Sequence, residues 1–144
     1  MLHLLTTTNK KVIIYKAQIL SYHFDMLPNN YRLKKRTAFN ATYRTGKSIH
    51  KNGITVFCGR KKKNNETTKI GFVVSKKVHK RAVKRNRIKR LMRESIRLHI
   101  KNSAQIDNCK YLSLIFVANS KLLDKNFSEV NSSMELLLEK LLND

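Results

Sequence analysis

The most basic part of the chain is residues 75–94, which read SKKVHKRAVKRNRIKRLMRE. Lys and Arg occupy ten of the eighteen positions 76–93, and no acidic residue occurs before Glu94. A solvated helix normally balances such charges with acids at i, i+4, because like charges at that spacing destabilise an isolated helix. The stretch therefore indicates a surface that binds a polyanion.

The same stretch has the spacing of an amphipathic helix over residues 79–100. At 100° per residue, five mainly apolar side chains gather on one side, and these are Ile88, Leu91, Met92, Ser95 and His99. The opposite side carries mostly basic side chains, which are Asn86, Lys89, Arg90, Arg93 and Arg97. We expect the first side to pack against the body of the protein and the second to face water and the polyanion.

The whole composition agrees with this local pattern. The 144 residues include 31 Lys+Arg against 9 Asp+Glu, a formal net charge of +22, and residues 26–120 hold 25 of the basic residues and only three of the acids. An enzyme of small neutral metabolites has no need for such a field, so nucleic acid is the favoured partner. A membrane surface is the weaker alternative. The apolar runs are too short to span a bilayer, and we expect a cytoplasmic protein that does not bind membranes.

On the N-terminal side, the pattern predicts a short helix. Thr37 is the expected N-cap of a helix that runs through Tyr43 and ends at Gly46. Residues 1–25 have weak periodicity and no caps. We interpret them as an N-terminal extension, disordered or produced by a misassigned start, ahead of a single domain at residues 26–144.

Strands are expected between the two helices. Alternating apolar residues predict strands at 54–58 and 70–74, and a further short strand is expected around residues 48–50. The polar residues 60–68 would join the first two as a long hairpin loop, so that 70–74 is the return strand.

On the C-terminal side, residues 111–118 form a continuous apolar run that predicts a buried strand. Asn126 followed by Glu129 resembles a capping box and opens a helix with an apolar stripe from Phe127 to Leu141. The element order is α-β-β-β-α-β-α. This order predicts an α+β protein that folds as a single-domain two-layer α/β sandwich.

The chain lacks the residues of a catalytic or metal site. Cys58 and Cys109 stand in unrelated contexts without a CxxC motif, and the central region offers only three acids, too few to hold two metal ions. His99 lies on the apolar side of its helix and is expected to pack, and Glu94 is expected to pair with nearby arginines. We predict no catalytic residue, no metal and no cofactor bound by this chain.

Gly46-Lys47-Ser48 imitates the end of a phosphate-binding P-loop. The first glycine of that motif would fall at position 41, which is Ala41, and a helix precedes the segment where the motif needs a strand. A nucleoside triphosphatase is therefore rejected.

From about Tyr31 to Leu141, the chain resembles the bacterial ribonuclease P protein family. The resemblance rests on Arg85-Asn86-Arg87-Ile88-Lys89-Arg90-Leu91-Met92-Arg93-Glu94, which match the RNR signature of that family. Gly71-Phe72-Val73-Val74-Ser75-Lys76-Lys77 looks like the strand that leads into it, and Leu33-Lys34-Lys35 followed by Phe39 and Tyr43 is similar to the family's first helix. Two departures are Tyr43, where the family often has Phe, and Lys80-Arg81, where small and Gly-containing residues are usual.

The resemblance implies a ribosomal-protein-like fold with a left-handed βαβ crossover that carries the signature helix. It also implies a subunit that binds a catalytic RNA, 1:1, and helps it remove the 5′ leader of precursor tRNA, with Mg²⁺ required by the RNA. The implied RNA-binding positions are Lys76, Lys77, Arg81, Arg85, Asn86, Arg87, Lys89, Arg90 and Arg93. The aromatic residues Phe39, Tyr43 and Phe57 would line a cleft for the single-stranded leader, where bases stack on aromatic rings.

Two alternatives stay open at this point. A structural ribosomal protein or a general nucleic-acid-binding protein would carry the same charge but ignore the leader. A protein that cleaves RNA itself would need acid–base residues, and the scattered His50, His79 and His99 do not form a convincing pair.

Overall fold

The computed structural model describes residues 27–103 and 106–144, so the interpretation of residues 1–25 lies outside the described residues. In chain order, the elements are η3 (Asn29–Tyr31), α2 (Arg36–Arg44), β1 (Lys47–Lys51), β2 (Ile54–Cys58), β3 (Lys69–Val73), α3 (Ala82–Ser103), β4 (Ser113–Ala118), η4 (Ser120–Leu122) and α4 (Phe127–Leu142). Apart from the two short 3₁₀ turns, this is the predicted order α-β-β-β-α-β-α, and the α+β class is confirmed.

The four strands form one mixed sheet with the order β1-β2-β4-β3. Strand β2 is antiparallel to both β1 and β4, whereas β3 is parallel to β4. The predicted hairpin between β2 and β3 is therefore wrong, because β4 lies between these two strands. Parallel neighbours need a crossover connection, and α3 supplies it between β3 and β4. The left hand of this crossover stays a prediction of the family resemblance.

The hairpin of this sheet joins β1 to β2 instead. Its turn consists of Asn52 and Gly53, which both have positive φ, 48° and 87°. Asn-Gly is the preferred pair for a two-residue hairpin turn with this backbone. A Cβ at Gly53 would also lie 2.8 Å from the Asn119 side-chain oxygen, so glycine is required for space as well as for conformation.

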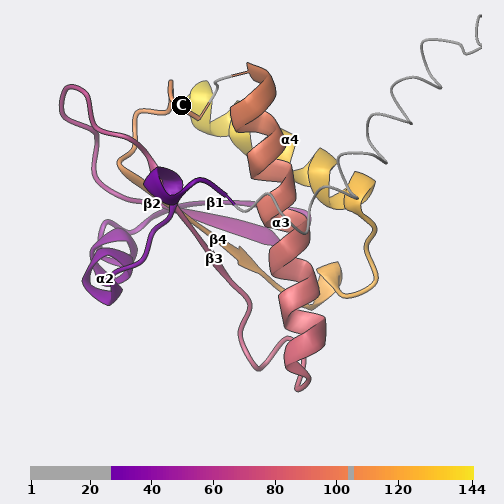
Figure 1. The fold of residues 1–144 in the computed structure, drawn as a ribbon. Helices are drawn as coiled ribbons and strands as arrows, with labels where there is room; N and C mark the ends of the chain where they lie inside the picture. Colours follow the sequence, from indigo (N-terminus) through magenta and orange to yellow (C-terminus); the bar gives the residue numbers. More distant parts are fainter. Residues whose placement is uncertain (1–26, 104–105) are drawn as a thin grey trace, which may run out of the picture.

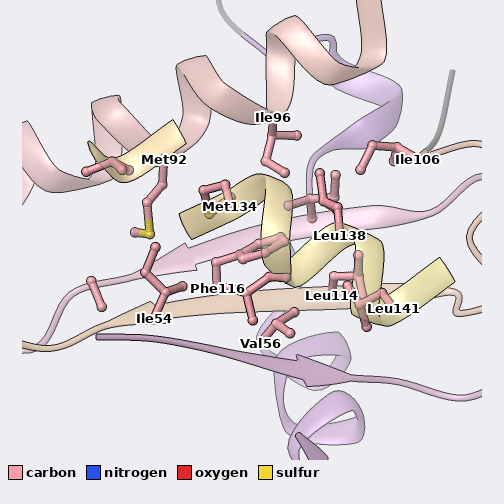
Figure 2. Packing of buried hydrophobic residues seen from close by; sticks show 14 of the residues in the cluster. Ile54, Val56, Met92, Ile96, Ile106, Leu114, Phe116, Met134, Leu138 and Leu141 are labelled. Carbon is pink, nitrogen blue, oxygen red and sulfur yellow. The ribbon is translucent and has the colours of Figure 1, made fainter. Parts of the chain in front are cut away.

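The main core lies between one face of the sheet and the helices α3 and α4 (Figure 2). Strand β2 alternates between buried and half-buried residues, as predicted, and α4 buries one apolar stripe. The largest core side chains from the sheet and both helices include Ile54, Ile70, Ile88, Met92, Ile96, Leu114, Phe116 and Met134. The sheet and the helices α3 and α4 form two layers, as predicted, but α2 adds a further element on the opposite face of the sheet. Helix α2 lies on the other side of the sheet (Figure 1), where the Thr42 hydroxyl and the Ser113 hydroxyl are 2.6 Å apart.

The sequence predicted the N-terminal cap of α4 correctly but not that of α2. At α4 the capping box is confirmed, because the Asn126 side chain accepts from the Glu129 N–H and the Glu129 side chain accepts from the Asn126 N–H, both at 2.9 Å. At α2 the predicted N-cap Thr37 is wrong. The N-cap is Lys35, whose main-chain carbonyl accepts from the Phe39 N–H at 3.1 Å without any side-chain cap.

Helix α3 begins at Ala82, three residues later than predicted. His79 belongs to the turns before the helix, where its ring Nδ1 accepts from the Arg81 N–H at 3.0 Å. This side-chain bond satisfies the Arg81 N–H, one of the N–H groups at a helix start that have no partner within the helix.

The placement of Arg97 on the water-facing side of α3 is also wrong. The five consecutive residues 94–98 are all buried, and Arg97 is only 8% exposed. Its guanidinium makes two bonds to the Glu94 carboxylate, at 2.8 and 3.0 Å, which confirms the expected role of Glu94. A helix projection shows the direction of a side chain but not what packs around it.

Candidate nucleic-acid interface

The first half of α3, Ala82 to Arg93, presents most of the predicted RNA-binding residues to solvent. Only Ile88 and Met92 are buried there, and the apolar Val83 is 77% exposed. The predicted residues that are exposed are Lys76, Lys77, Arg81, Asn86, Arg87 and Arg90, and those that are half-buried are Arg85, Lys89 and Arg93. Because one narrow stripe anchors this half, charges on its remaining sides stay accessible to a polyanion.

Two arginines of the signature also bond to main-chain carbonyls. Arg85 donates to the carbonyls of His79 and Lys80, at 3.1 and 3.2 Å, and so closes the turn before its own helix. Arg87 donates to the carbonyls of Leu123 and Lys125, at 3.4 and 2.9 Å, in the connection between η4 and α4. Each guanidinium has five N–H donors, so these bonds leave donors for phosphate.

A cleft of about 300 Å³ lies at the β3 edge of the sheet, between α3 and the segment that leads into α2. The Leu33 N–H donates to the Ile70 carbonyl at 2.9 Å, which holds this segment along β3. The lining residues that we use to define the β3-edge cleft are two aromatics and four cations, Phe39, Phe72, Arg32, Lys34, Lys89 and Arg93. The cleft thus combines aromatic rings with positive charge, as single-stranded nucleic acid requires.

Phe39 occupies this cleft because β3 has a glycine at the matching position. A Cβ on Gly71 would lie 2.7 Å from two atoms of the Phe39 ring, a distance that real Cβ contacts do not show. Any larger residue at 71 would displace the ring. The glycine is therefore part of the site although it carries no functional group.

Phe72 is a site residue that sequence reasoning missed. Its ring stacks on Phe116 with centroids 5.9 Å apart, and the Arg93 guanidinium carbon lies 5.9 Å from its centroid. Its alternation in β3 indicated a core residue, and the residue is half-buried. An aromatic in the strand immediately before the basic helix was the signal that could have found it.

Tyr43 and Phe57, the other two predicted cleft residues, pair with each other outside the lining of the β3-edge cleft. Their centroids are 5.0 Å apart with the rings at 74°, an edge-to-face contact. Tyr43 is 38% exposed, and the partial burial of its hydroxyl raises its pKa. The three predicted aromatics therefore divide into Phe39 in the cleft and a Tyr43–Phe57 pair between α2 and β2.

Glu66 and the two cysteines are the other chemically notable residues, and they lie outside the cleft lining. Glu66 bonds to Arg60 at 2.7 and 3.0 Å and accepts from the Lys63 N–H, which lowers its pKa to about 2. Burial raises the pKa of the Cys58 thiol to about 11 and that of Cys109 as well, and both are free cysteines.

Gly46, with a φ of 72°, joins α2 to β1, so the rejected P-loop imitation is a helix-to-strand turn. Within residues 27–103 and 106–144, we find neither a cluster of three metal-ligating side chains nor a helix able to cross a membrane.

Comparison with known proteins agrees with the fold and the signature. The family model for ribonuclease P matches residues 27–142, which is most of the chain. The chain belongs to the ribonuclease P protein family. As a member of this family it is the RNA-binding subunit of an endoribonuclease whose catalysis resides in the RNA, which confirms the function predicted from the sequence.

The chain covers nearly the whole length of the relatives that it matches. The ribonuclease P protein component of Clostridium novyi is 36% identical over 79% of this chain and 96% of its own, and that of Clostridium kluyveri is 39% identical over 76% and 93%. The Staphylococcus aureus RNase P protein structure has a TM-score of 0.63 at 30% identity, covering 78% of this chain and 98% of that one. The Thermotoga maritima RNase P protein has a TM-score of 0.60 at 26% identity, covering 78% and 96%.

Proposed function

We propose that this chain joins two RNAs in a cytoplasmic 1:1 particle. The first half of α3 binds the catalytic RNA of ribonuclease P, and the β3-edge cleft holds the single-stranded 5′ leader of precursor tRNA. The catalytic RNA hydrolyses the phosphodiester with its own Mg²⁺, and this chain supplies no catalytic group. Residues 26–144 carry this function as one domain.

The observation that carries the proposal is the meeting of the signature helix and the predicted aromatic residue in one cleft. Phe39 comes from α2, and Lys89 and Arg93 come from α3, yet all three line the same space. Stacking on a ring is tolerant of sequence, and the neighbouring cations attract the phosphates between bases. This combination suits a substrate strand whose sequence varies from one tRNA precursor to another.

The catalytic RNA would be bound mainly by charge. Double-helical and folded RNA is recognised through phosphates and 2′-hydroxyls more than through base edges, so a convex basic helix is a suitable surface. The residues proposed for this contact are Lys76, Lys77, Arg81, Arg85, Asn86, Arg87, Lys89, Arg90 and Arg93. Phe39, Tyr43 and Phe57 are proposed for the leader, with the edge-to-face pair extending the stacking surface away from the cleft.

Reconstitution with the cognate RNA tests the proposal. We expect the protein to stimulate leader removal at low Mg²⁺ compared with the RNA alone. Its Lys and Arg side chains would neutralise phosphates that Mg²⁺ otherwise screens. No stimulation would contradict it. Adding the protein without the RNA is the control, and we expect no cleavage from it.

Leader-dependent binding separates this function from general nucleic-acid binding. The affinity of the reconstituted particle is compared for precursor tRNA and for the same tRNA without its leader, at several salt concentrations. We expect tighter binding of the leader-bearing substrate. Equal affinity for both would favour a protein that follows charge alone.

A further inference from the structure

The second arginine of the signature bonds to a part of the chain that is distant in sequence. Arg87 lies in the second turn of α3, and its two terminal nitrogens donate to two carbonyls that are 36 and 38 residues further along the chain. By contrast, Arg85 bonds only to carbonyls five and six residues before it. Arg87 therefore joins two elements, whereas Arg85 closes a local turn.

The carbonyls that Arg87 reaches belong to the connection between η4 and α4. Residues 123–126 link η4 to α4. Their main-chain bonds reach residues three or four positions away, as from the Leu123 N–H to the Ser120 carbonyl and from the Lys125 N–H to the Leu122 carbonyl. The carbonyls of Leu123 and Lys125 both accept from the one guanidinium. A planar fork can bond two acceptors at once, which the single ammonium of Lys cannot match in geometry.

We propose that Arg87 is a positioning residue, which holds the first half of α3 against the η4–α4 connection and so orients the neighbouring RNA-binding side chains. This inference rests on the proposed function for its consequence in RNA binding. Asn86 and Arg90 lie on the same two turns of the helix. If the first half of α3 can move, these side chains must be ordered when RNA binds, which costs conformational entropy. A helix that is already held in place avoids this cost, so Arg87 would strengthen RNA binding without itself contacting the RNA.

For Arg87, this positioning role replaces the direct contact with the catalytic RNA that its membership of the signature implies. The two roles differ in their response to Arg87→Lys and to salt. A phosphate contact survives replacement by Lys and adds about 0.7–0.9 to the slope of log affinity against log salt. The positioning role is lost with Lys, and it leaves that slope unchanged because the charge on the surface stays the same.

The experiment compares Arg87→Lys and Arg87→Gln with Lys101→Arg and Lys101→Gln in the full-length chain. Hydrogen exchange of residues 120–126 is measured on the free protein. Affinity for the catalytic RNA is measured across a salt series at a temperature where every variant is fully folded. We expect Arg87→Lys to speed exchange in residues 120–126 and to weaken RNA binding by about threefold to tenfold with an unchanged slope. Lys101 is an exposed cation on the same helix outside the proposed RNA-binding set, so Lys101→Arg and Lys101→Gln should leave both properties close to those of the unchanged chain.

Three results would overturn the proposal. The first is that Arg87→Lys leaves exchange in residues 120–126 unchanged. The second is that Arg87→Lys speeds exchange in residues 120–126 but leaves RNA affinity unchanged, which means that the Arg87 bonds stabilise the fold without affecting RNA binding. The third is that Arg87→Lys keeps the RNA affinity of the unchanged chain while Arg87→Gln reduces the slope of log affinity against log salt, which means that Arg87 contacts a phosphate. If the unchanged chain fails to bind the catalytic RNA, the proposed function fails instead, and the exchange result still decides whether Arg87 holds the connection.

Discussion

The two halves of α3 both contain basic residues, but they differ in charge density and in environment. In the half from Ala82 to Arg93, two residues are buried and the basic side chains are exposed or half-buried. In the half that follows, residues 94–98 are buried on every side, and the one arginine among them, Arg97, is bonded to Glu94. A basic residue on this helix is thus available to RNA only where the rest of the protein leaves it uncovered.

This contrast shows how one helix serves both stability and binding. A buried charge needs a paired and hydrogen-bonded partner, because removing it from water is costly. An exposed cation has no such need, and in the first half the absence of acidic neighbours keeps the surface positive. The single acid of the helix therefore stands at Glu94, where the exposed half ends and the buried half begins.

The largest effect is expected from removing the buried partner. Glu94→Ala takes away the carboxylate that accepts two bonds from Arg97, so we expect a loss of about 3–5 kcal/mol in the free energy of unfolding. Denaturant unfolding measures it. The matched control is Lys84→Ala in the exposed half, for which we expect a change within about 0.5 kcal/mol. Similar values for both variants would abolish the distinction between the two halves.

A smaller effect, on specificity, is expected in the β3-edge cleft. Phe39→Ala removes a ring that we propose stacks on a leader base, so discrimination between leader-bearing and leaderless substrate should fall by about 1–3 kcal/mol. The ratio of the two affinities is the measurement, because lost packing against Gly71 changes both affinities together. Phe39→Tyr keeps an aromatic face and should retain the discrimination. An unchanged ratio in Phe39→Ala would remove Phe39 from the leader site.

The basic residues in the first half of α3 should affect the binding of all RNAs alike. We expect Arg90→Ala and Arg93→Ala each to weaken binding and to reduce the slope of log affinity against log salt by about 0.7–0.9, the share of one phosphate contact. Titrations at several salt concentrations measure this slope for the catalytic RNA and for precursor tRNA. If Arg90→Ala or Arg93→Ala lowered affinity without changing the slope, that side chain would act through packing.

The smallest effect is expected from an exposed ion pair, which contrasts with the buried one. The folded pKa of Glu66 is about 2, below its ordinary value of 4.5, because Arg60 and the Lys63 N–H bond to the charged carboxylate. The stability that this charged carboxylate contributes to the fold is therefore present above pH 4.5 and is lost as the pH falls toward 2. Nuclear magnetic resonance titration of the Lys63 amide should report this loss, and Glu66→Gln should not show it. A midpoint near 4.5 in the unchanged chain would mean that the pair does not form in solution.

Local patterns predicted the elements, and non-local pairing caused the main errors. The α4 capping box and the alternation of β2 involve residues a few positions apart, so they could be predicted from the sequence. The partner of β2 could not, because any of several apolar strands satisfies the same alternation, and only packing of the whole sheet places β4 beside it. The Asn52–Gly53 turn was a local signal for the β1–β2 hairpin that the prediction did not use.

The candidate site divides in the same way. Charge and helical period identified the basic surface of α3, since both are properties of the residues themselves. The meeting of Phe39 with Lys89 and Arg93 depends on strand order, because α2 and α3 reach the cleft from opposite sides of the β3 edge.

The sequence by itself determined the polyanion-binding character, the element order and the family. Those features depend on composition, on short-range spacing and on a contiguous signature. The tertiary structure alone decided which charges are available, because it buries Arg97, leaves Arg90 exposed and directs Arg87 to carbonyls 36 and 38 residues away. The physical reason is that burial depends on what other parts of the chain cover, and this follows from long-range packing rather than from the helix itself.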